Sequence, residues 1–305
     1  MVLLVGVVVL SLLNVGDLER FGLLLGQAQP QWLLVAVAAQ SATYLCAGTI
    51  WGRVGVAAGH RLPGRTLARL SVERLTLDQL IPVGGMAGDV VLVRAMTRMG
   101  LPSSVGTEAL LVDTLSYNAA FAGVCIVATA ALWLRHDVTP VLVGLLAACA
   151  VLAAAVPLGI RWLLGHRDWR PGRWLGRIGL LSRVLQAVAS VSSERVWDPG
   201  LLASSTVLQL AIFGLDSSTL WAMLRALGMN VPLQTAFIAT VIATMAGTLS
   251  FLPGGIGSFE AGATATLVLL GVPVEDALTG TLLMRGLTLW LPLVPGLILA
   301  RRDLG

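Results

Sequence analysis

The stretch Leu252-Pro253-Gly254-Gly255-Ile256-Gly257-Ser258-Phe259-Glu260 interrupts a long apolar run with a proline, three glycines and a carboxylate. Proline removes a backbone N–H donor and glycine releases the chain from helical geometry, so about one turn of polar backbone should lie open here. Irregular backbone at membrane depth is tolerated only where protein or a water-filled cavity receives it. The stretch is therefore predicted to be a functional site inside a hydrophobic bundle.

The composition places the chain among polytopic membrane proteins. Of its 305 residues, 56% are hydrophobic and 12% are charged, whereas soluble domains carry roughly 25% charged residues. We predict an all-α fold, a single integral membrane domain over 1–305, with about six spanning helices and two re-entrant Pro-Gly-Gly hairpins. The formal charge of +4 fits basic cytoplasmic loops, so no nucleic-acid partner is expected.

The three cysteines stand singly in apolar runs, at Cys46, Cys125 and Cys149. They have no metal-ligand spacing, and buried small hydrophobes of this kind are usually inert. We therefore expect neither a metal nor another cofactor.

A looser copy of the opening motif lies 171 positions earlier, in the stretch from Ile81 to Asp89. The copies align without a gap and both precede a long apolar run, which indicates an internal repeat. The aligned pairs are Pro82 with Pro253, Gly84 with Gly255, Asp89 with Glu260, Gly100 with Gly271 and Pro102 with Pro273. We assign repeat 1 to about 31–134 and repeat 2 to about 201–300, with a helix and a basic segment at about 139–197 between them.

The remaining apolar segments are expected to be helical. Residues 1–13 are interpreted as a first transmembrane helix, because the alternative, a signal peptide, requires a basic start and a small-residue cleavage site. The further helices are predicted at 31–54, 66–80, 103–134, 139–164, 201–224, 233–251, 258–270 and 277–300.

The distribution of arginine decides the expected topology. If the first Pro-Gly-Gly unit crossed the membrane once, the seven arginines between Arg161 and Arg195 would lie outside, against the positive-inside rule. Re-entrant hairpins keep them in the cytoplasm and give the two repeats opposite orientations, with both termini cytoplasmic. The segment 233–251 is nevertheless long enough to cross alone at about 1.5 Å per residue.

Two basic regions are expected at the cytoplasmic surface. The first contains the arginines from Arg53 to Arg74. The second, 161–195, also carries three tryptophans, and its arginines and indoles suit lipid headgroups. Membrane anchoring is its simplest interpretation, and a regulatory site is the alternative.

The acids at the two breaks, Asp89 and Glu260, fall in the first turn of a predicted helix. Such a turn attracts phosphate, and a carboxylate there either caps free N–H groups or meets a cationic headgroup, an arginine or a coupling proton. Both interpretations remain open.

Asp113 and Arg285 lie about ten residues inside long predicted helices, which is roughly 15 Å deep. An unpaired charge there costs at least ~3 kcal/mol, so Arg285 is expected to bind a lipid phosphate or to pair with Asp113 or Glu260, and a purely structural ion pair is the alternative. The weaker candidates are Asp216 and Asp78, whereas Glu108 is expected to be solvated or a cap.

The motif at 253–260, its echo at 82–89 and the step Gly271-Val272-Pro273 resemble the lysylphosphatidylglycerol synthase transmembrane (flippase) family, over about 31–300. The resemblance implies lipid translocation: some members flip aminoacylated phosphatidylglycerol, and others accompany polyprenyl-phosphate glycosyltransferases or hopanoid metabolism. The sequence ends at Gly305 with no soluble aminoacyl-transferase domain, so lysyl transfer is not carried over.

We therefore expect a multi-pass flippase of a bacterial or archaeal cell membrane, acting on a phospholipid or an isoprenoid lipid. Its predicted binding residues are Pro82, Gly84, Gly85, Asp89, Asp113, Pro253, Gly254, Gly255, Gly257, Glu260 and Arg285. The alternatives are an accessory partner of a separate lipid-linked glycosyltransferase or lipid-modifying enzyme, and an intramembrane lipid-modifying enzyme. No catalytic residues are assigned, because no grouping of histidine, acid and nucleophile occurs. A homo-oligomer is compatible with the sequence.

Overall fold

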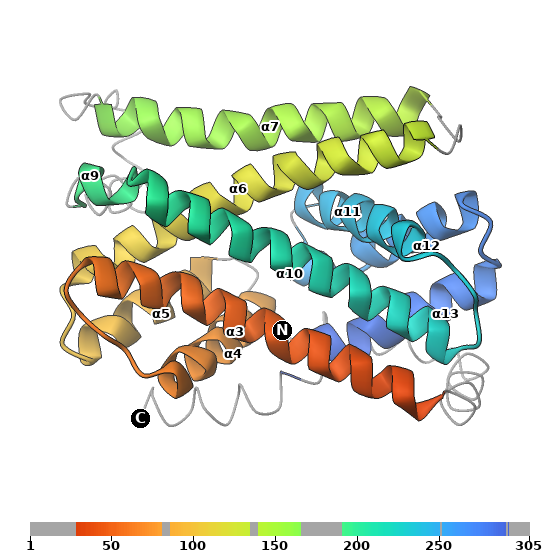
Figure 1. Cartoon of the computed structure of the whole chain (residues 1–305), viewed down its shortest axis with the longest axis horizontal. Coiled ribbons are helices and arrows are strands. Elements are labelled where there is room, and N and C mark those ends of the chain that lie inside the picture. The colour runs from red at the N-terminus through yellow and green to blue at the C-terminus, as the bar shows by residue number, and fades with distance from the viewer. Residues whose placement is uncertain are drawn as a thin grey trace.

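The computed structural model describes residues 29–80, 86–134, 140–165, 191–250, 252–290 and 292. These residues are helical apart from short turns and contain no strand, which confirms the all-α polytopic class (Figure 1). The elements are α3 (Pro30–Ala57), α4 (Gly64–Leu80), α5 (Met86–Arg98), α6 (Ser103–Leu134), α7 (Pro140–Gly165), α9 (Ser193–Val196), α10 (Pro199–Ala226), α11 (Leu233–Leu249), the 3-10 turn η2 (Pro253–Gly255), α12 (Ser258–Leu269), α13 (Val274–Arg285) and the π-helical turn η3 (Gly286–Trp290).

Three of these helices are long and apolar enough to cross a membrane. Helices α3, α6 and α10 have 28, 32 and 28 residues, so at about 1.5 Å per residue each exceeds a hydrocarbon core of about 30 Å. Shorter apolar segments lie at Leu146–Trp162 and Leu233–Leu249. About six spanning helices were predicted, and within the described ranges three helices are long and apolar enough to span a membrane.

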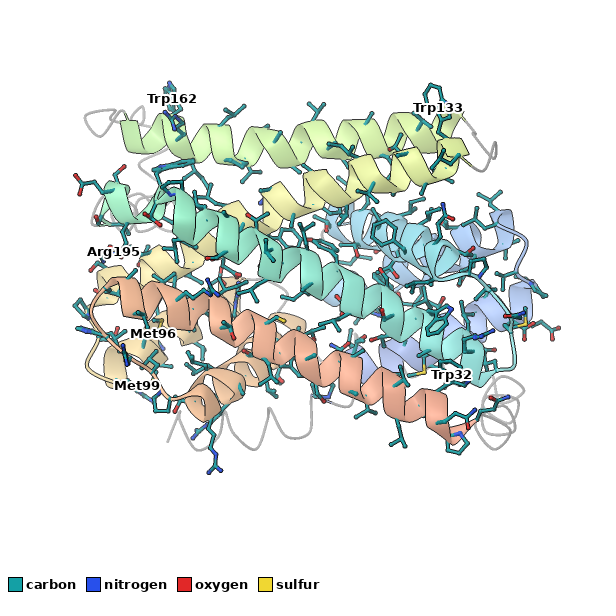
Figure 2. All side chains as sticks on the ribbon, in the orientation of Figure 1. Trp32, Met96, Met99, Trp133, Trp162 and Arg195 are labelled. Carbon is teal, nitrogen blue, oxygen red and sulfur yellow. The ribbon has the colours of Figure 1, made fainter. Side chains whose placement is uncertain are left out.

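Exposed tryptophans mark two ends of the helix pair α6–α7. Figure 2 shows Trp133 at one end and Trp162 at the other, both pointing away from the bundle. Tryptophan is enriched at the two membrane–water interfaces. The positions of these indoles therefore fit a membrane normal that runs along the long axis of the molecule.

Helices α3 and α10 pack side by side in antiparallel directions. The backbone N–H of Gln29, before α3, donates to the carbonyl of Ala226, the last residue of α10, at 3.0 Å. Nearby, the rings of Trp32 and Trp221 meet edge to face at 5.0 Å. Since the start of one helix lies at the end of the other, the two helices run in opposite directions.

Each of these long helices leads into a helical hairpin. In the first hairpin α4 packs on α5, with Leu67 and Leu70 in the same buried cluster as Leu92 and Met96. In the second, α11 packs on α12 through small residues: a Cβ on Gly262 would lie 3.0 Å from the Cβ of Ala246. Small residues let helix backbones approach closely.

Three pairs of helices in the two halves of the chain have similar lengths. Helices α3 and α10 both have 28 residues, α4 and α11 both have 17, and α5 and α12 have 13 and 12. Left-handed glycines follow corresponding helices, Gly59 and Gly228 after the long helices and Gly100 and Gly271 after the second hairpin helices. The order, length and turn geometry of these three pairs thus recur, whereas the helices that follow them, α6 and α13, have 32 and 12 residues.

The last described helix departs from its predicted course. One helix was expected over 277–300, but α13 begins at Val274, after Pro273, and its α-helical part ends at Arg285. Proline removes a backbone donor and crowds the carbonyl four residues earlier, so Pro292 accounts for the change to π geometry in η3. Residues 293–305 lie outside the described part of the chain.

The two halves touch near this irregular segment. The hydroxyl oxygen of Thr76, in α4, lies 3.3 Å from the carbonyl oxygen of Pro292, although its single proton has a closer acceptor, the carbonyl of Val72 at 2.8 Å. Helix α4 also contacts the tip turn η2 of the other hairpin. The first hairpin therefore meets both the tip of the second hairpin and the end of the chain segment that carries Arg285.

Candidate functional site

The tip of the second hairpin is built from glycines in left-handed conformations. Gly254, Gly255 and Gly257 have φ values of 59°, 64° and 85°, which residues with a Cβ adopt only at a cost. A Cβ on Gly255 would also come within 2.9 Å of the Cα of Gly247 on α11. The glycines thus reverse the chain and let the tip lie against α11.

Glu260 joins this tip to the start of α12 and to α13. Its Oε2 accepts the backbone N–H of Gly257 at 2.6 Å, and its Oε1 accepts Nε–H of Arg285 at 2.7 Å. The first contact satisfies one of the free donors at a helix start. The carboxylate therefore caps the helix and pairs with an arginine at once, so a cap contact and an arginine contact occur together.

Arg285 is held from three sides. Besides Glu260, its Nη2 donates to the carbonyl of Gly254 at 2.5 Å, and its guanidinium lies 4.8 Å from the centre of the Phe259 ring. The side chains of Arg285 and Glu260 are only 11% and 17% exposed. Among the described residues Nη1 has no hydrogen-bond partner, which leaves a donor for an incoming anion.

A shallow apolar groove begins beside this pair and follows the α12–α13 surface, with a volume of about 710 Å³. Gly257 and Glu260 form its polar end. The rest of its lining comes from Ala261, Thr264, Ala265, Val268, Leu269, Val274 and Leu278. A charged end therefore continues directly into an apolar channel on the surface of the bundle.

A second charged network lies in the first half of the chain, around Arg74 of α4. Its Nη2 lies 2.8 Å from Asp89 Oδ1 of α5, and its Nη1 donates to Asp113 Oδ2 of α6 at 2.5 Å. Gln209 of α10 donates to the other oxygen of Asp113 at 2.8 Å. Four helices are thus joined through one arginine and one aspartate.

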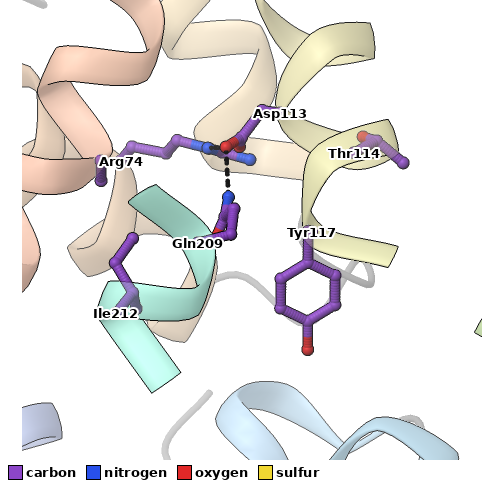
Figure 3. A pocket seen from close by; sticks show the side chains of 7 residues that line it. Arg74, Asp113, Thr114, Tyr117, Gln209 and Ile212 are labelled. Atoms are coloured by element: carbon purple, nitrogen blue, oxygen red, sulfur yellow. Dashed lines mark hydrogen bonds and ion pairs between the residues drawn. The ribbon is translucent and has the colours of Figure 1, made fainter. Parts of the chain in front are cut away.

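Figure 3 shows Arg74, Asp113 and Gln209 of this network at the wall of a pocket, which has a volume of about 330 Å³. Tyr117 and Thr114 of α6 and Ile212 of α10 complete most of its wall. The guanidinium of Arg74 also lies 5.2 Å from the centre of the Trp51 ring. Charge and aromatic surface therefore face a cavity in the interior of an apolar bundle.

The structure resolves which charges pair. Of the partners expected for Arg285, the structure has Glu260, whereas Asp113 pairs with Arg74 and Gln209. Asp89, like Glu260, lies in the first turn of a second hairpin helix and meets an arginine. A carboxylate–guanidinium pair thus follows both of the predicted breaks, although Pro82, Gly84 and Gly85 lie outside the described residues.

Two sequence interpretations were wrong. Arg74 was grouped with the cytoplasmic arginines, yet it is inside the bundle because α4 folds back along α5 and brings it to two aspartates. Glu108 was expected to be solvated or a cap of its own helix, but it is only 2% exposed and accepts the N–H of Ser192 at 3.0 Å and Arg195 Nη1 at 2.5 Å. The basic segment that ends near Arg195 is thereby attached to α6.

Arg74 and Gln209 are the site residues that the sequence interpretation missed. Arg74 lies within the segment predicted at 66–80, so the rule that an ionisable residue in a membrane segment is a functional candidate applied to it. Gln209 had a weaker signal, a lone amide in an apolar helix. Asp216 is half-buried in α10, and the side chain of Asp78 lies outside the described set.

Comparison with known proteins gives two matches. The family described as "Lysylphosphatidylglycerol synthase TM region" matches residues 1–296. A phosphatidylglycerol lysyltransferase of Staphylococcus haemolyticus (strain JCSC1435) is 33% identical over 155 residues, which are 51% of this chain and 15% of that protein. The chain thus matches only a small part of that relative's length. Since the family match covers nearly the whole sequence, the protein belongs to the lysylphosphatidylglycerol synthase transmembrane-region family.

Proposed function

We propose that the protein moves a phospholipid, or a polyprenyl-phosphate-type lipid, between the two leaflets of a cell membrane without changing it chemically. The observation that carries the proposal is the contact of Arg285 with Glu260 and Gly254, which puts a mostly buried guanidinium against the glycine tip of a hairpin. An arginine inside an apolar bundle is costly and is found where substrates pass. Family membership supports a lipid as that substrate.

The headgroup chemistry that we propose is recognition of a phosphate by Arg285. A guanidinium binds phosphate oxygens through paired N–H donors, and Nη1 is directed to no other described partner. The start of α12 adds the positive end of a helix dipole. We propose a phosphatidylglycerol-type headgroup, with or without an attached amino acid, because the S. haemolyticus relative is named for phosphatidylglycerol.

The transport cycle that we propose uses the two halves as an inverted-topology repeat. The antiparallel course of α3 and α10 supports opposite orientations of the halves, and each long helix leads into a helical hairpin. We propose that both hairpins are re-entrant, with the α4–α5 hairpin entering from the cytoplasm and the α11–α12 hairpin from outside, and that both termini are cytoplasmic. Such repeats serve alternating access in transporters.

The test is movement of fluorescent phosphatidylglycerol across proteoliposomes, measured by quenching of the outer leaflet. Glu260→Gln and Arg285→Ala should each slow transport about tenfold or more, which corresponds to ~1.4 kcal/mol of lost stabilisation. Glu194→Gln and Arg53→Ala are matched controls, because both side chains are exposed, and they should transport at the unmodified rate.

Unchanged transport in both site variants would refute the assignment of Arg285 and Glu260. Purified protein that moves no lipid at all, yet does so together with a co-purified glycosyltransferase, would favour an accessory role. A change in lipid mass during the assay would instead favour an enzyme.

A further inference from the structure

The groove on the α12–α13 surface has a polar end and an apolar end. Gly257 and Glu260 lie at the polar end, next to Arg285. Towards the other end the groove is edged by exposed large apolar side chains, namely Val268, Leu269, Val274 and Leu278. The groove therefore matches an amphiphilic molecule, because it is charged at one end and apolar along the rest.

Small side chains form the floor of the groove. Ala261 and Ala265 are four residues apart and so lie on one face of α12, and Gly257 precedes them at the start of the helix. Ala261 and Ala265 are exposed. A narrow chain can therefore lie along this face between the larger side chains at its edges.

We propose that this groove holds one acyl chain of the transported lipid while the phosphate of the same lipid lies at Arg285 and Glu260. The proposal rests on the proposed function, because it assumes that a lipid headgroup reaches that pair. The occupant is a lipid chain rather than a protein segment, since the groove opens on an apolar helix surface and the one charged residue among its described lining residues is at the headgroup end.

The dimensions of the groove suit a chain in one leaflet. From Gly257 to Leu269 an α-helix rises about 18 Å, close to half of a hydrocarbon core of about 30 Å. Because lipid tails are as apolar as the groove, little hydrophobic energy is gained by moving from one to the other. The groove is therefore inferred to orient the lipid, whereas the charged pair supplies its affinity.

The direction of the groove identifies the leaflet from which the lipid comes. Its apolar end lies by the α12–α13 turn, where Val272 packs in one cluster with Ala36 near the start of α3. A bound lipid whose tail points to this end has its headgroup at the hairpin tip, so its headgroup faces away from the α12–α13 turn. Lipids have this orientation in the leaflet on the opposite side of the membrane from that turn. We infer that the lipid approaches from the leaflet beside the α3–α4 connection.

The experiment uses phosphatidylglycerol with a photoreactive diazirine near the end of one acyl chain, in nanodiscs that contain the full chain. Labelled peptides are identified by mass spectrometry. Labelling should concentrate on the segment from Val268 to Leu278 and be lost in Ala265→Trp, which fills the groove. Ala154→Trp is the matched control, an exposed alanine on α7, and should label like the unmodified protein.

Ala261→Leu blocks the groove with a smaller side chain and should give the same loss of labelling. It therefore serves as the test if Ala265→Trp fails to fold. Labelling that is spread evenly over the exposed helices, or that persists in both blocked variants, would overturn the groove. Label at Gly257 to Ala261 instead would reverse the inferred orientation and overturn the approach from the α3–α4 side. These readouts need no transport, so a protein that labels as expected but moves no lipid would refute the proposed function alone.

Discussion

Glu260 combines two contacts that are usually made by different residues. One carboxylate oxygen caps α12 and the other neutralises Arg285. An anion that takes over Arg285 leaves this carboxylate without its cation, while the cap still holds it near the tip. Ligand binding at Arg285 is therefore expected to change the hairpin tip as well as the local charge.

Removal of the charge of Glu260 should destabilise the fold as well as slow transport. Glu260→Gln leaves Arg285 mostly buried without its carboxylate, and breaking a buried pair costs about 3 kcal/mol or more. The double variant Glu260→Gln with Arg285→Gln should lose less than the sum of the two single variants. Thermal unfolding of the purified proteins measures the cycle, and strictly additive losses would argue against the pair.

The network around Arg74 should depend more on Asp113 than on Asp89. The side chain of Asp113 is 11% exposed and also accepts from Gln209, whereas that of Asp89 is 36% exposed. Asp113→Asn is therefore expected to lower unfolding stability by about 1 kcal/mol more than Asp89→Asn. Denaturant or thermal unfolding would test the order, and equal losses would contradict it.

At the residue scale, the sequence located Asp89, Glu260 and Arg285 because a break motif or depth in an apolar helix marks such residues. The partners were harder to predict. Arg74 and Asp113 are 39 positions apart and Gln209 and Asp113 are 96 apart. Helical periodicity relates residues three or four apart, so it contains no information on pairs of this kind.

At the scale of elements, the second hairpin depends on close contact between glycines. A Cβ on Gly255 would meet the backbone of Gly247, which cannot move aside without displacing α11. Gly257 has a larger φ, but a Cβ added there would meet no neighbouring atom within 4 Å. A side chain at Gly255 would therefore add a steric clash to the backbone strain, whereas a side chain at Gly257 would add backbone strain alone.

Gly255→Ala should consequently be more damaging than Gly257→Ala. The second change adds only the strain of a left-handed residue, about 1–2 kcal/mol, while the first adds a steric clash to the same strain. Thermal stability and transport should fall in that order. A larger effect of Gly257→Ala would show that the tip of this hairpin does not rest on α11 as described.

Helix positions were predicted well where hydropathy alone defines them. The segment predicted at 103–134 coincides with α6, and the other described helices begin and end within a few residues of the prediction. The last helix, predicted at 277–300, changes geometry inside that range: it is α-helical to Arg285, π-helical from Gly286 to Trp290 and helical again at Pro292. The effect of Pro292 on the preceding turn is steric, so hydropathy did not reveal this change.

At the scale of the whole molecule, the positions of the connections make the topology testable. In the structure Leu62 and Leu101, which flank the α4–α5 hairpin, pack near one buried cluster. Cysteines introduced at Arg61 and Met99, in protein lacking its three native cysteines, should therefore react from the same side of the membrane. A cysteine at Glu275, in the first turn of α13, should react from the other side.

Membrane-impermeant maleimide applied to oriented vesicles measures this sidedness. Labelling of Arg61→Cys and Met99→Cys from opposite sides would show a single crossing and refute the re-entrant scheme. The all-α class followed from the composition, whereas the five aligned positions predict a repeat whose inverted topology these labelling experiments would test. The charge rule, by contrast, misplaced Arg74, because it counts residues along the chain and cannot show that a hairpin turns them inward.

The contact between the Thr76 hydroxyl and the carbonyl of Pro292 joins the two segments that carry the charged networks. Thr76 lies two residues after Arg74, and Pro292 lies seven residues after Arg285. If a ligand at Arg285 shifts the segment that carries Pro292, we expect the packing of α4 around Arg74 to change as well. Such coupling is reciprocal, so neutralising Asp113 is expected to alter the phosphate affinity that we propose for Arg285, even though the two side chains are not in contact.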